Sequence, residues 1–283
     1  MGIVTVVAEP SELSFALAQA AIANRAVEWP GLGRRDPSPL RLVVVRDSAS
    51  MDAVSRGRAP GWGAGLALPG QRTIILRADL EDPGRTLRHE LAHLALHEAV
   101  SGRVPLWFDE GYASYAAGEW DRLEELRLSV AMATMAPPEL RELDGWLRGN
   151  APMANLAYAL AITAVLELSR RNPSGTLAPL FTRLRAGDRF ETALLATTGL
   201  TADRFESVWQ RRLRRQYNIL TWLIAGGFWF LVALLLASAL WYRRRADRPR
   251  RAALDQGWVV PGDTGAPTER LPGASGVDPT ARS

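Results

Sequence analysis

The chain has 283 residues, of which 47% are hydrophobic and 23% charged; this balance excludes a disordered protein and allows a sizeable core. It contains no cysteine, which excludes disulfides and thiolate metal sites, so any bound metal needs nitrogen or oxygen ligands. The net charge is +4, and residues 243–283 carry eight arginines against five acidic residues, so the body of the chain is nearly neutral. That distribution argues against nucleic acid as a partner.

The first part of the chain is predicted to form a small sheet with one helix. Residues 11–28 have the apolar spacing of a helix. The β-branched run 40–45 predicts a strand, and residues 65–68 and 73–76 flank Pro69-Gly70 in the manner of a hairpin. About three strands are therefore expected, with the helix packed on them.

The three histidines of the chain all lie in one predicted helix, which begins near Asp82-Pro83 and ends near Gly102. His89 and His93 are four residues apart, so they project from one face of the helix, one turn apart. Two imidazoles in this position can hold one metal ion, and Glu90 can reach a water on that metal. The H-E-x-x-H pattern therefore indicates a zinc hydrolase site.

The chain from here to residue 217 is predicted to be almost entirely helical, in segments separated by proline and glycine. These segments run over 107–118, 121–134, 153–171, 176–186, 189–198 and 201–217. A sheet followed by helices indicates an α+β fold, with a small N-terminal β-sheet lobe and then a mainly α-helical lobe.

A long apolar stretch follows the helical segments. No charged residue occurs from Gln216 to Tyr242, and residues 219–242 are overwhelmingly apolar. At about 1.5 Å per residue, a helix of this length crosses a hydrocarbon core of about 30 Å. This predicts one C-terminal transmembrane helix in contact with a lipid bilayer, and the length disfavours the alternative of a buried core helix.

A catalytic zinc with three protein ligands needs one further donor, and Glu110 is the best candidate. Sixteen residues separate it from His93, enough for one helix to end and a second to begin. The alternative for Glu110 is a solvated carboxylate at a helix start, and Glu119 is the second candidate ligand. The three histidines span about 12 Å of helix, too far for one ion, so His97 is expected at the rim of the site or behind its ligands, with a surface histidine as the alternative. Asp109 either orients a ligand histidine or is simply exposed.

The two segments together resemble a known family. His89-Glu90-x-x-His93 followed by Trp107-x-x-Glu110-Gly111-x-Ala113-x-Tyr115 resembles the gluzincin metallopeptidases, in particular the peptidase MA-like domains. The resemblance covers residues 40–217. It implies a zinc ion on His89, His93 and Glu110, a base role for Glu90, and a peptide or protein substrate.

Further expectations follow from the same resemblance. Tyr158 resembles the tyrosine that begins the corresponding helix in peptidase MA-like domains, which implies a donor for the developing oxyanion. The alternative for Tyr158 is a half-buried packing residue. The Gly-x-Met-Glu-Asn segment of gluzincin aminopeptidases is absent, so an endopeptidase is expected rather than an aminopeptidase. Strand 73–76 is expected to pair with an extended substrate.

The sequence thus predicts a membrane-anchored, zinc-dependent metallopeptidase. The expected parts are an N-terminal helix and linker (1–39), a zincin-like metallopeptidase domain (40–217), a transmembrane helix (218–242) and a basic, then disordered tail (243–283). The alternative is a catalytically silent gluzincin-like fold that acts as a membrane-tethered binding or assembly module. The arginines after the span favour a single-pass protein of the cell membrane with an extracytoplasmic catalytic domain, although arginines at 211–215 weaken that preference.

Overall fold

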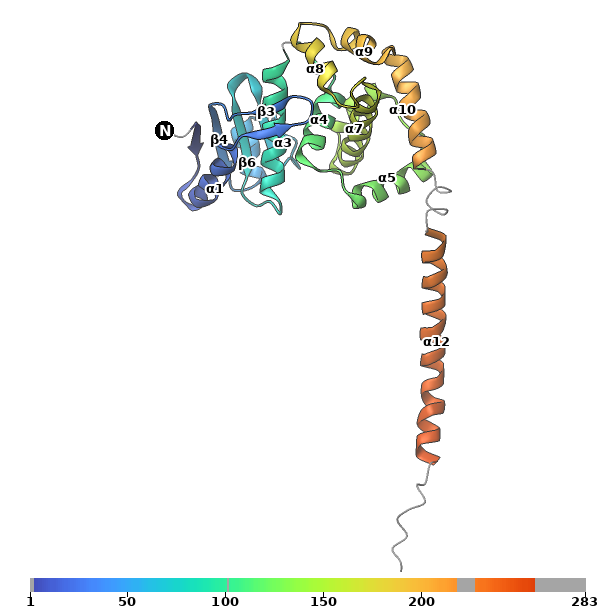
Figure 1. Cartoon of the computed structure of the whole chain (residues 1–283). Coiled ribbons are helices and arrows are strands. Elements are labelled where there is room, and N and C mark those ends of the chain that lie inside the picture. Colours follow the sequence, from blue (N-terminus) through green and yellow to red (C-terminus); the bar gives the residue numbers. More distant parts are fainter. Residues whose placement is uncertain (1–2, 101, 218–226, 258–283) are drawn as a thin grey trace, which may run out of the picture. The chain divides into compact units, whose positions relative to one another are not determined.

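A mixed β-sheet comes first along the chain and a group of helices follows it, which makes the fold α+β (Figure 1). The computed structural model describes residues 3–100, 102–217 and 227–257. The chain divides into two units, residues 1–225 and 226–283. The first unit holds the sheet and the helices around it, and within the second the described element is one long helix.

The sheet has four strands in the order β1 (Val4–Val7), β4 (Leu40–Val45), β6 (Thr73–Arg77) and β5 (Gly65–Leu68). The first three strands run parallel, and β5 runs antiparallel to β6. The predicted hairpin around Pro69-Gly70 is confirmed, since β5 and β6 pair directly. β5 is an edge of the sheet, while β6 lies between two neighbours.

The sheet lobe contains more strands than the sequence predicts. β1 adds a fourth strand to the sheet, and β2 (Val27–Trp29) pairs with β3 (Gly33–Arg35) in a separate hairpin. The predicted helix 11–28 is shorter, because α1 (Leu13–Ala23) ends before β2 begins. The parallel pairing of β1 with β4 brings together segments far apart in sequence, so no local turn signal announces it.

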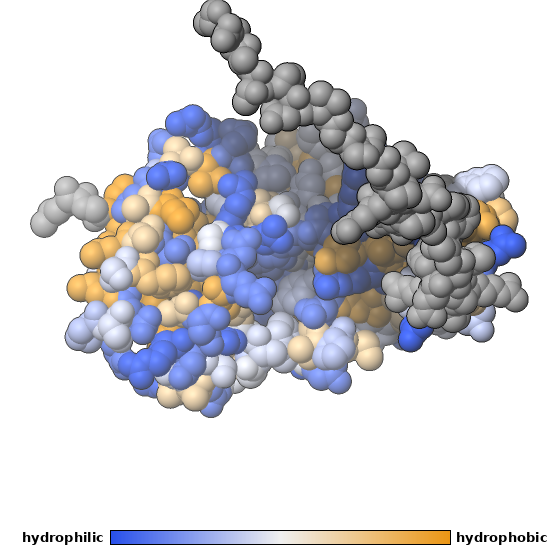
Figure 2. All heavy atoms as spheres, turned by 90° about the horizontal axis from the view of Figure 1, so that it is seen from below, coloured by the Kyte–Doolittle hydropathy of each residue, from blue (hydrophilic) through white to orange (hydrophobic). Residues whose placement is uncertain are grey.

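Helices cover both faces of the sheet. α1 and α3 (Pro83–Ala99) lie against the face that carries Leu42, Ile74 and Leu76, all of which are buried. α2 (Ser48–Ser55) covers the opposite face, where Met51 contacts Ile75. The outer side of α1 leaves apolar side chains such as Leu13 and Leu17 exposed, and hydrophobic residues gather on this side at the left of Figure 2.

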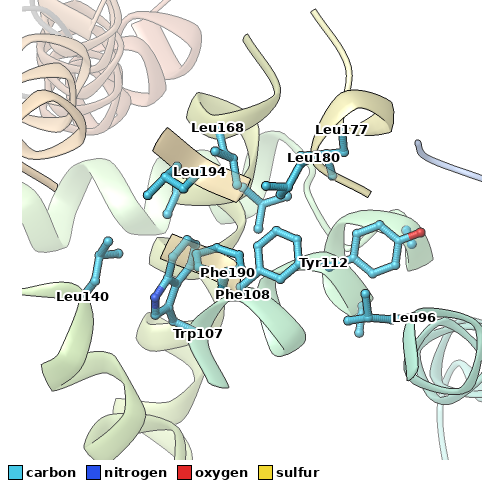
Figure 3. Close-up of a cluster of buried hydrophobic side chains, with 14 of the residues drawn as sticks. Leu96, Trp107, Phe108, Tyr112, Leu140, Leu168, Leu177, Leu180, Phe190 and Leu194 are labelled. Atoms are coloured by element: carbon cyan, nitrogen blue, oxygen red, sulfur yellow. The ribbon is translucent and has the colours of Figure 1, made fainter. Parts of the chain in front are cut away.

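The helical lobe is built around α4 (Leu106–Ala117) and α7 (Ala151–Arg171), which pack closely against each other. The surrounding helices are α5 (Arg122–Thr134), α6 (Leu140–Leu147), α8 (Ala178–Arg185), α9 (Phe190–Thr198) and α10 (Ala202–Gln216). An aromatic cluster with Trp107, Phe108 and Phe190 at its centre fills the space between them (Figure 3). The predicted helices are confirmed; α6 was missed because prolines and glycines bracket so short a helix.

The structure describes only part of the predicted transmembrane segment. Residues 218–226 lie outside the described residues. Of the rest of the segment, α12 (Phe228–Gly257) contains the 15 residues 228–242. Fifteen residues of helix extend about 22 Å, short of the hydrocarbon thickness of about 30 Å. Among the described helices, one is long and apolar enough to cross a membrane, namely α7, and it is mostly buried as a core helix of the first unit.

Candidate active site

The site is built on α3, whose start and orientation follow from its sequence. Asp82 caps the helix by accepting a hydrogen bond from the backbone N–H of Arg85, with Pro83 in the first turn. Leu87 and Leu94 face the sheet core. This orientation turns His89 and His93 toward α4, and the three H-E-x-x-H residues all remain under 10% exposed: His89, Glu90 and His93.

Three side chains from two helices converge at the centre of the site. His89 and His93 of α3 place their Nε2 atoms 3.2 Å apart. The Oε2 atom of Glu110, on α4, lies 3.4 Å from Nε2 of His89 and 3.5 Å from Nε2 of His93. Among the described residues these three form the cluster that could hold a metal ion.

The spacing of these three atoms fits a tetrahedral zinc ion. Ligand atoms about 2.0–2.1 Å from such an ion lie about 3.3–3.4 Å from one another. The observed separations of 3.2, 3.4 and 3.5 Å match that edge length. Two imidazole nitrogens and one carboxylate are also the donors expected of a catalytic zinc in a protein without cysteine.

The other ring nitrogen of each histidine is held by a carboxylate. Nδ1 of His89 lies 3.0 Å from Oε1 of Glu119, and Nδ1 of His93 lies 2.6 Å from Oδ1 of Asp109. A carboxylate that accepts from Nδ1–H fixes the tautomer that leaves Nε2 free to bind metal. Glu119, the second candidate ligand, therefore lies on the far side of His89 from the cluster and orients that ring.

Asp109 also contacts the third histidine. Its Oδ2 atom is 2.6 Å from Nε2 of His97, which is about one third exposed. The expectation that His97 lies outside the metal cluster agrees with this geometry. Asp109 is nearly buried, but its hydrogen bonds to His93 and His97 outweigh the cost of burial and lower its pKa to about 2, so it stays ionised.

Asp109→Asn is expected to weaken zinc binding by about 10- to 100-fold, because the carbonyl of asparagine can still accept from His93 but carries no charge. Zinc affinity measured by competition with a chromophoric chelator tests this. His97→Gln is the matched control, since it changes the other contact of Asp109 and should leave zinc affinity close to that of the parent. Equal zinc affinity in Asp109→Asn and the parent would contradict the orienting role.

Close packing of α4 on its neighbours fixes the position of Glu110. A Cβ atom at Gly111 would come within 2.6 Å of the carbonyl oxygen of Ala161 on α7, so only glycine allows the two helices to approach this far. Arg88 of α3 donates through Nε to the carbonyl oxygen of Ala116 at 2.6 Å, which joins the two site helices. In the Glu-Gly pair, Glu110 thus supplies a donor of the cluster, and Gly111 allows α4 to pack closely on α7.

Glu90 lies against the edge strand β5. Its carboxylate accepts a hydrogen bond from the backbone N–H of Ala67. A Cβ atom at Gly65 would lie 2.5 Å from Oε1 of Glu90, closer than Cβ atoms in proteins approach other side chains. The sequence predicts Gly65 only as part of a hairpin strand, but the absence of a side chain there makes room for the carboxylate.

Gly65→Ala is expected to lower the turnover number by about 100-fold while zinc stays bound, because the added methyl group displaces the carboxylate of Glu90. Turnover on a fluorogenic peptide, together with metal content by mass spectrometry, tests this. Gly70→Ala in the same hairpin is the control, since no atom lies within 4 Å of a Cβ there. If the two alanine variants have equal turnover, Gly65 does not position Glu90.

These residues open into a cavity of about 600 Å³. Tyr158, from α7, lines it and donates a hydrogen bond to Glu110, with its ring 6.0 Å from that of His89. Trp62 lines it from the loop before β5; its Nε1 donates to the carbonyl oxygen of Gly149, and its ring meets that of Tyr158 edge-on. The cavity therefore joins the sheet lobe and the helical lobe around the cluster.

Burial and charge shift the ionisation of the central groups. Burial alone lowers the pKa of His89, but the charge of Glu119 and hydrogen bonds to Glu110 and Glu119 raise it to about 10. The pKa of His93 is raised in the same way by Glu110 and Asp109, against the effect of burial. Burial would raise the pKa of Glu110, but the charges of His93 and His89 and their hydrogen bonds lower it well below its ordinary value.

The prediction that strand 73–76 pairs with the substrate is wrong, because the strand with a free edge is its neighbour in the sheet. Strand 73–76 is part of β6, whose two edges already pair with β4 and β5. The free edge beside α3 belongs to β5, residues Gly65–Leu68, and residues 65–67 line the cavity. Only an edge strand has unpaired backbone groups to offer a peptide.

Two histidines one helical turn apart, a glutamate from a second helix and a buried glutamate beside them define the site of a zinc metallopeptidase. The model of the Peptidase MA superfamily matches residues 18–215, and the chain belongs to this family. The match begins within α1. The resemblance seen in the sequence was expected to begin only at residue 40. A comparison with curated proteins found no match. The protein is a zinc metallopeptidase of this superfamily, and its family implies a peptide substrate.

Proposed function

We propose that the protein is a membrane-anchored endopeptidase in which His89, His93 and Glu110 hold the zinc ion and Glu90 is the general base. The observation that carries the assignment is the cluster of three donors at tetrahedral spacing, with the buried Glu90 next to two of them in sequence. When bound, zinc supplies a Lewis acid that polarises the scissile carbonyl and makes water a better nucleophile.

Glu90 is suited to accept a proton. Burial raises the pKa of its carboxyl, and the positive charges of His89 and His93 oppose that rise only in part. A raised pKa brings a carboxylate closer to the range in which it both accepts and returns a proton near neutral pH. Glu90 would take a proton from the attacking water at its carboxylate and deliver it to the leaving amine nitrogen.

Tyr158 is proposed to stabilise the negative charge that develops on the carbonyl oxygen. Burial, followed by the charges of Glu110, Glu90 and Glu119, raises the pKa of its hydroxyl well above the ordinary value, so it stays protonated and able to donate. Its position in the cavity and its hydrogen bond to Glu110 support this role over a purely packing one.

Tyr158→Phe is expected to lower the turnover number by about 100- to 1000-fold with little change in the Michaelis constant, because the donor acts mainly in the transition state. Steady-state kinetics on a peptide substrate measure both constants. Trp62→Phe serves as a comparison that alters the neighbouring ring and should act mainly through the Michaelis constant. A Tyr158→Phe enzyme with parental turnover would place Tyr158 among the packing residues.

The cavity favours internal peptide bonds over amino-terminal ones. Four acidic side chains line it, Glu90, Asp109, Glu110 and Glu119, and all four already lie at the metal cluster or hold its histidines. None of these is left to bind a substrate ammonium group, and Arg58 and Arg148 on the lining would repel one. An extended chain paired with the β5 edge passes the cluster without needing a free end.

Hydrolysis of an unfolded protein tests the proposed activity. The full chain, purified in detergent, is expected to cleave a casein-like substrate, to lose activity with a zinc chelator and to regain it with added zinc. Sequencing of the new termini should find internal cleavages rather than stepwise removal from one end. A zinc-loaded preparation that cleaves no such substrate would favour the binding-module alternative.

The membrane anchor is proposed from the apolar segment 219–242. Its described part supports this, because α12 exposes large apolar side chains in succession, including Phe228, Trp229, Leu235 and Trp241. Exposed apolar residues on every side of a helix are costly in water and favourable in lipid. Flotation of the full chain with phosphatidylcholine vesicles after an alkaline wash should find it in the lipid fraction.

We further propose that the catalytic unit lies outside the cytoplasm. Arg243, Arg244 and Arg245 follow the apolar segment directly, and cytoplasmic flanks of membrane spans carry an excess of arginine. Protease treatment of intact spheroplasts should then degrade the catalytic unit. Protection of that unit until the membrane is permeabilised would reverse the assignment.

A further inference from the structure

A second cavity lies between the ends of α7 and α10, and it shares no lining residue with the active-site cavity. The two helix ends carry six arginines: Arg170, Arg171, Arg211, Arg212, Arg214 and Arg215. The cavity has a volume of about 530 Å³ and is lined by four of them, together with Glu167, Val208 and Gln216. Four arginines against one glutamate give its lining a net charge of +3.

The buried side chain of Glu167 holds two of the arginines that line this cavity. It is 2% exposed, and its Oε1 accepts from Nε of Arg171 at 2.7 Å while its Oε2 lies 3.4 Å from Nε of Arg212. These contacts hold two guanidinium groups side by side, so part of the entropy of ordering them is lost on folding rather than on binding a ligand. Guanidinium groups match the oxygen atoms of a phosphate in pairs, which lysine does not do.

The position of the cavity along the chain indicates which phosphate it meets. Gln216 lines the cavity, and the apolar segment begins at residue 219. Three residues extend at most about 11 Å, so a bilayer that holds residues 219–242 brings its headgroup layer within reach of the cavity. Basic side chains this close to a membrane surface are attracted to anionic lipids.

We propose that this cavity binds the phosphate group of an anionic phospholipid in the membrane that holds the anchor. The proposal rests on the membrane anchor argued under Proposed function, and it adds a specific lipid contact that would hold the catalytic unit close to the bilayer surface. The positive charge that would attract the phosphate is concentrated at this cavity, since the chain before residue 243 is nearly neutral as a whole.

The full chain in detergent can be titrated with short-chain phosphatidylglycerol, phosphatidylcholine and inorganic phosphate by calorimetry. Arg211→Gln with Arg215→Gln is expected to weaken phosphatidylglycerol binding by roughly 10- to 30-fold. Arg171 and Arg212 are left unchanged, because their removal would leave Glu167 buried without its partners. The matched control is Arg204→Gln with Arg214→Gln, which removes the same charge from α10 outside the cavity lining and should change binding less than twofold.

Each other outcome counts against the proposal. Equal binding of phosphatidylcholine would show that headgroup charge is not recognised, and equal binding of inorganic phosphate would indicate a site for a soluble anion. Equal losses in the two double variants would mean diffuse attraction rather than a site. Flotation with neutral vesicles reports on the anchor alone, so a failed anchor and a failed lipid site are told apart, and peptidase activity in detergent should be unchanged in both double variants.

Discussion

Glu90→Gln is expected to lower peptide hydrolysis by about 10²- to 10⁴-fold while the zinc content stays at the parental level. Glutamine keeps the size of the side chain and can still accept the hydrogen bond from the Ala67 N–H. A carboxamide cannot take up a proton near neutral pH, so only the transfer from water to the leaving amine is lost. Turnover on a casein-like substrate and zinc by mass spectrometry, both on the full chain, give the two readouts.

The comparison with a ligand variant makes this result specific. His93→Ala should lose zinc and activity together, because it removes one of three donors within 4.8 Å of one another. Glu90→Gln should lose activity alone. Parental turnover in Glu90→Gln would refute the base assignment, and joint loss of zinc and activity would instead make Glu90 a ligand or a structural residue.

The metal cluster could be predicted from sequence because its parts are close together in the chain. His89 and His93 share one helical face, and a single turn between two helices brings Glu110 to them. Helical periodicity and a short connection are local properties, so a sequence pattern carries them. The pattern favours Glu110 over Glu119 as the third ligand, and the geometry agrees with that preference, since Glu110 lies at the two Nε2 atoms and Glu119 at Nδ1 of His89.

What the sequence did not predict depends on contacts between distant segments. Gly65 matters because β5 passes within contact distance of Glu90 on α3, and nothing near Gly65 in the sequence indicates that approach. The place of β6 inside the sheet likewise depends on its parallel pairing with β4. A glycine at the start of a predicted strand is compatible with a close backbone approach, but it does not indicate which side chain approaches it.

Zinc binding to the metal-free protein is expected to release at least one proton at pH 7. The pKa of His89 is raised to about 10 by Glu119 and Glu110, and that of His93 is raised as well, so the histidine pair carries bound protons there. Zinc binds only the neutral imidazole, whereas Glu110 is already ionised because its pKa is lowered. Zinc affinity should therefore fall by about tenfold or more for each unit that the pH is lowered from 8 to 6.

Calorimetry in buffers with different ionisation enthalpies counts the released protons, and Glu119→Gln tests their origin. Removing this carboxylate takes away the largest influence that raises the pKa of His89, so burial then favours the neutral ring. The variant should bind zinc about 10- to 100-fold more weakly, because the ring is less well oriented, yet release fewer protons on binding.

An unchanged proton count with weaker binding would mean that Glu119 orients His89 without setting its charge. Stronger binding with fewer protons would mean that the cost of deprotonating His89 outweighs the benefit of holding its ring.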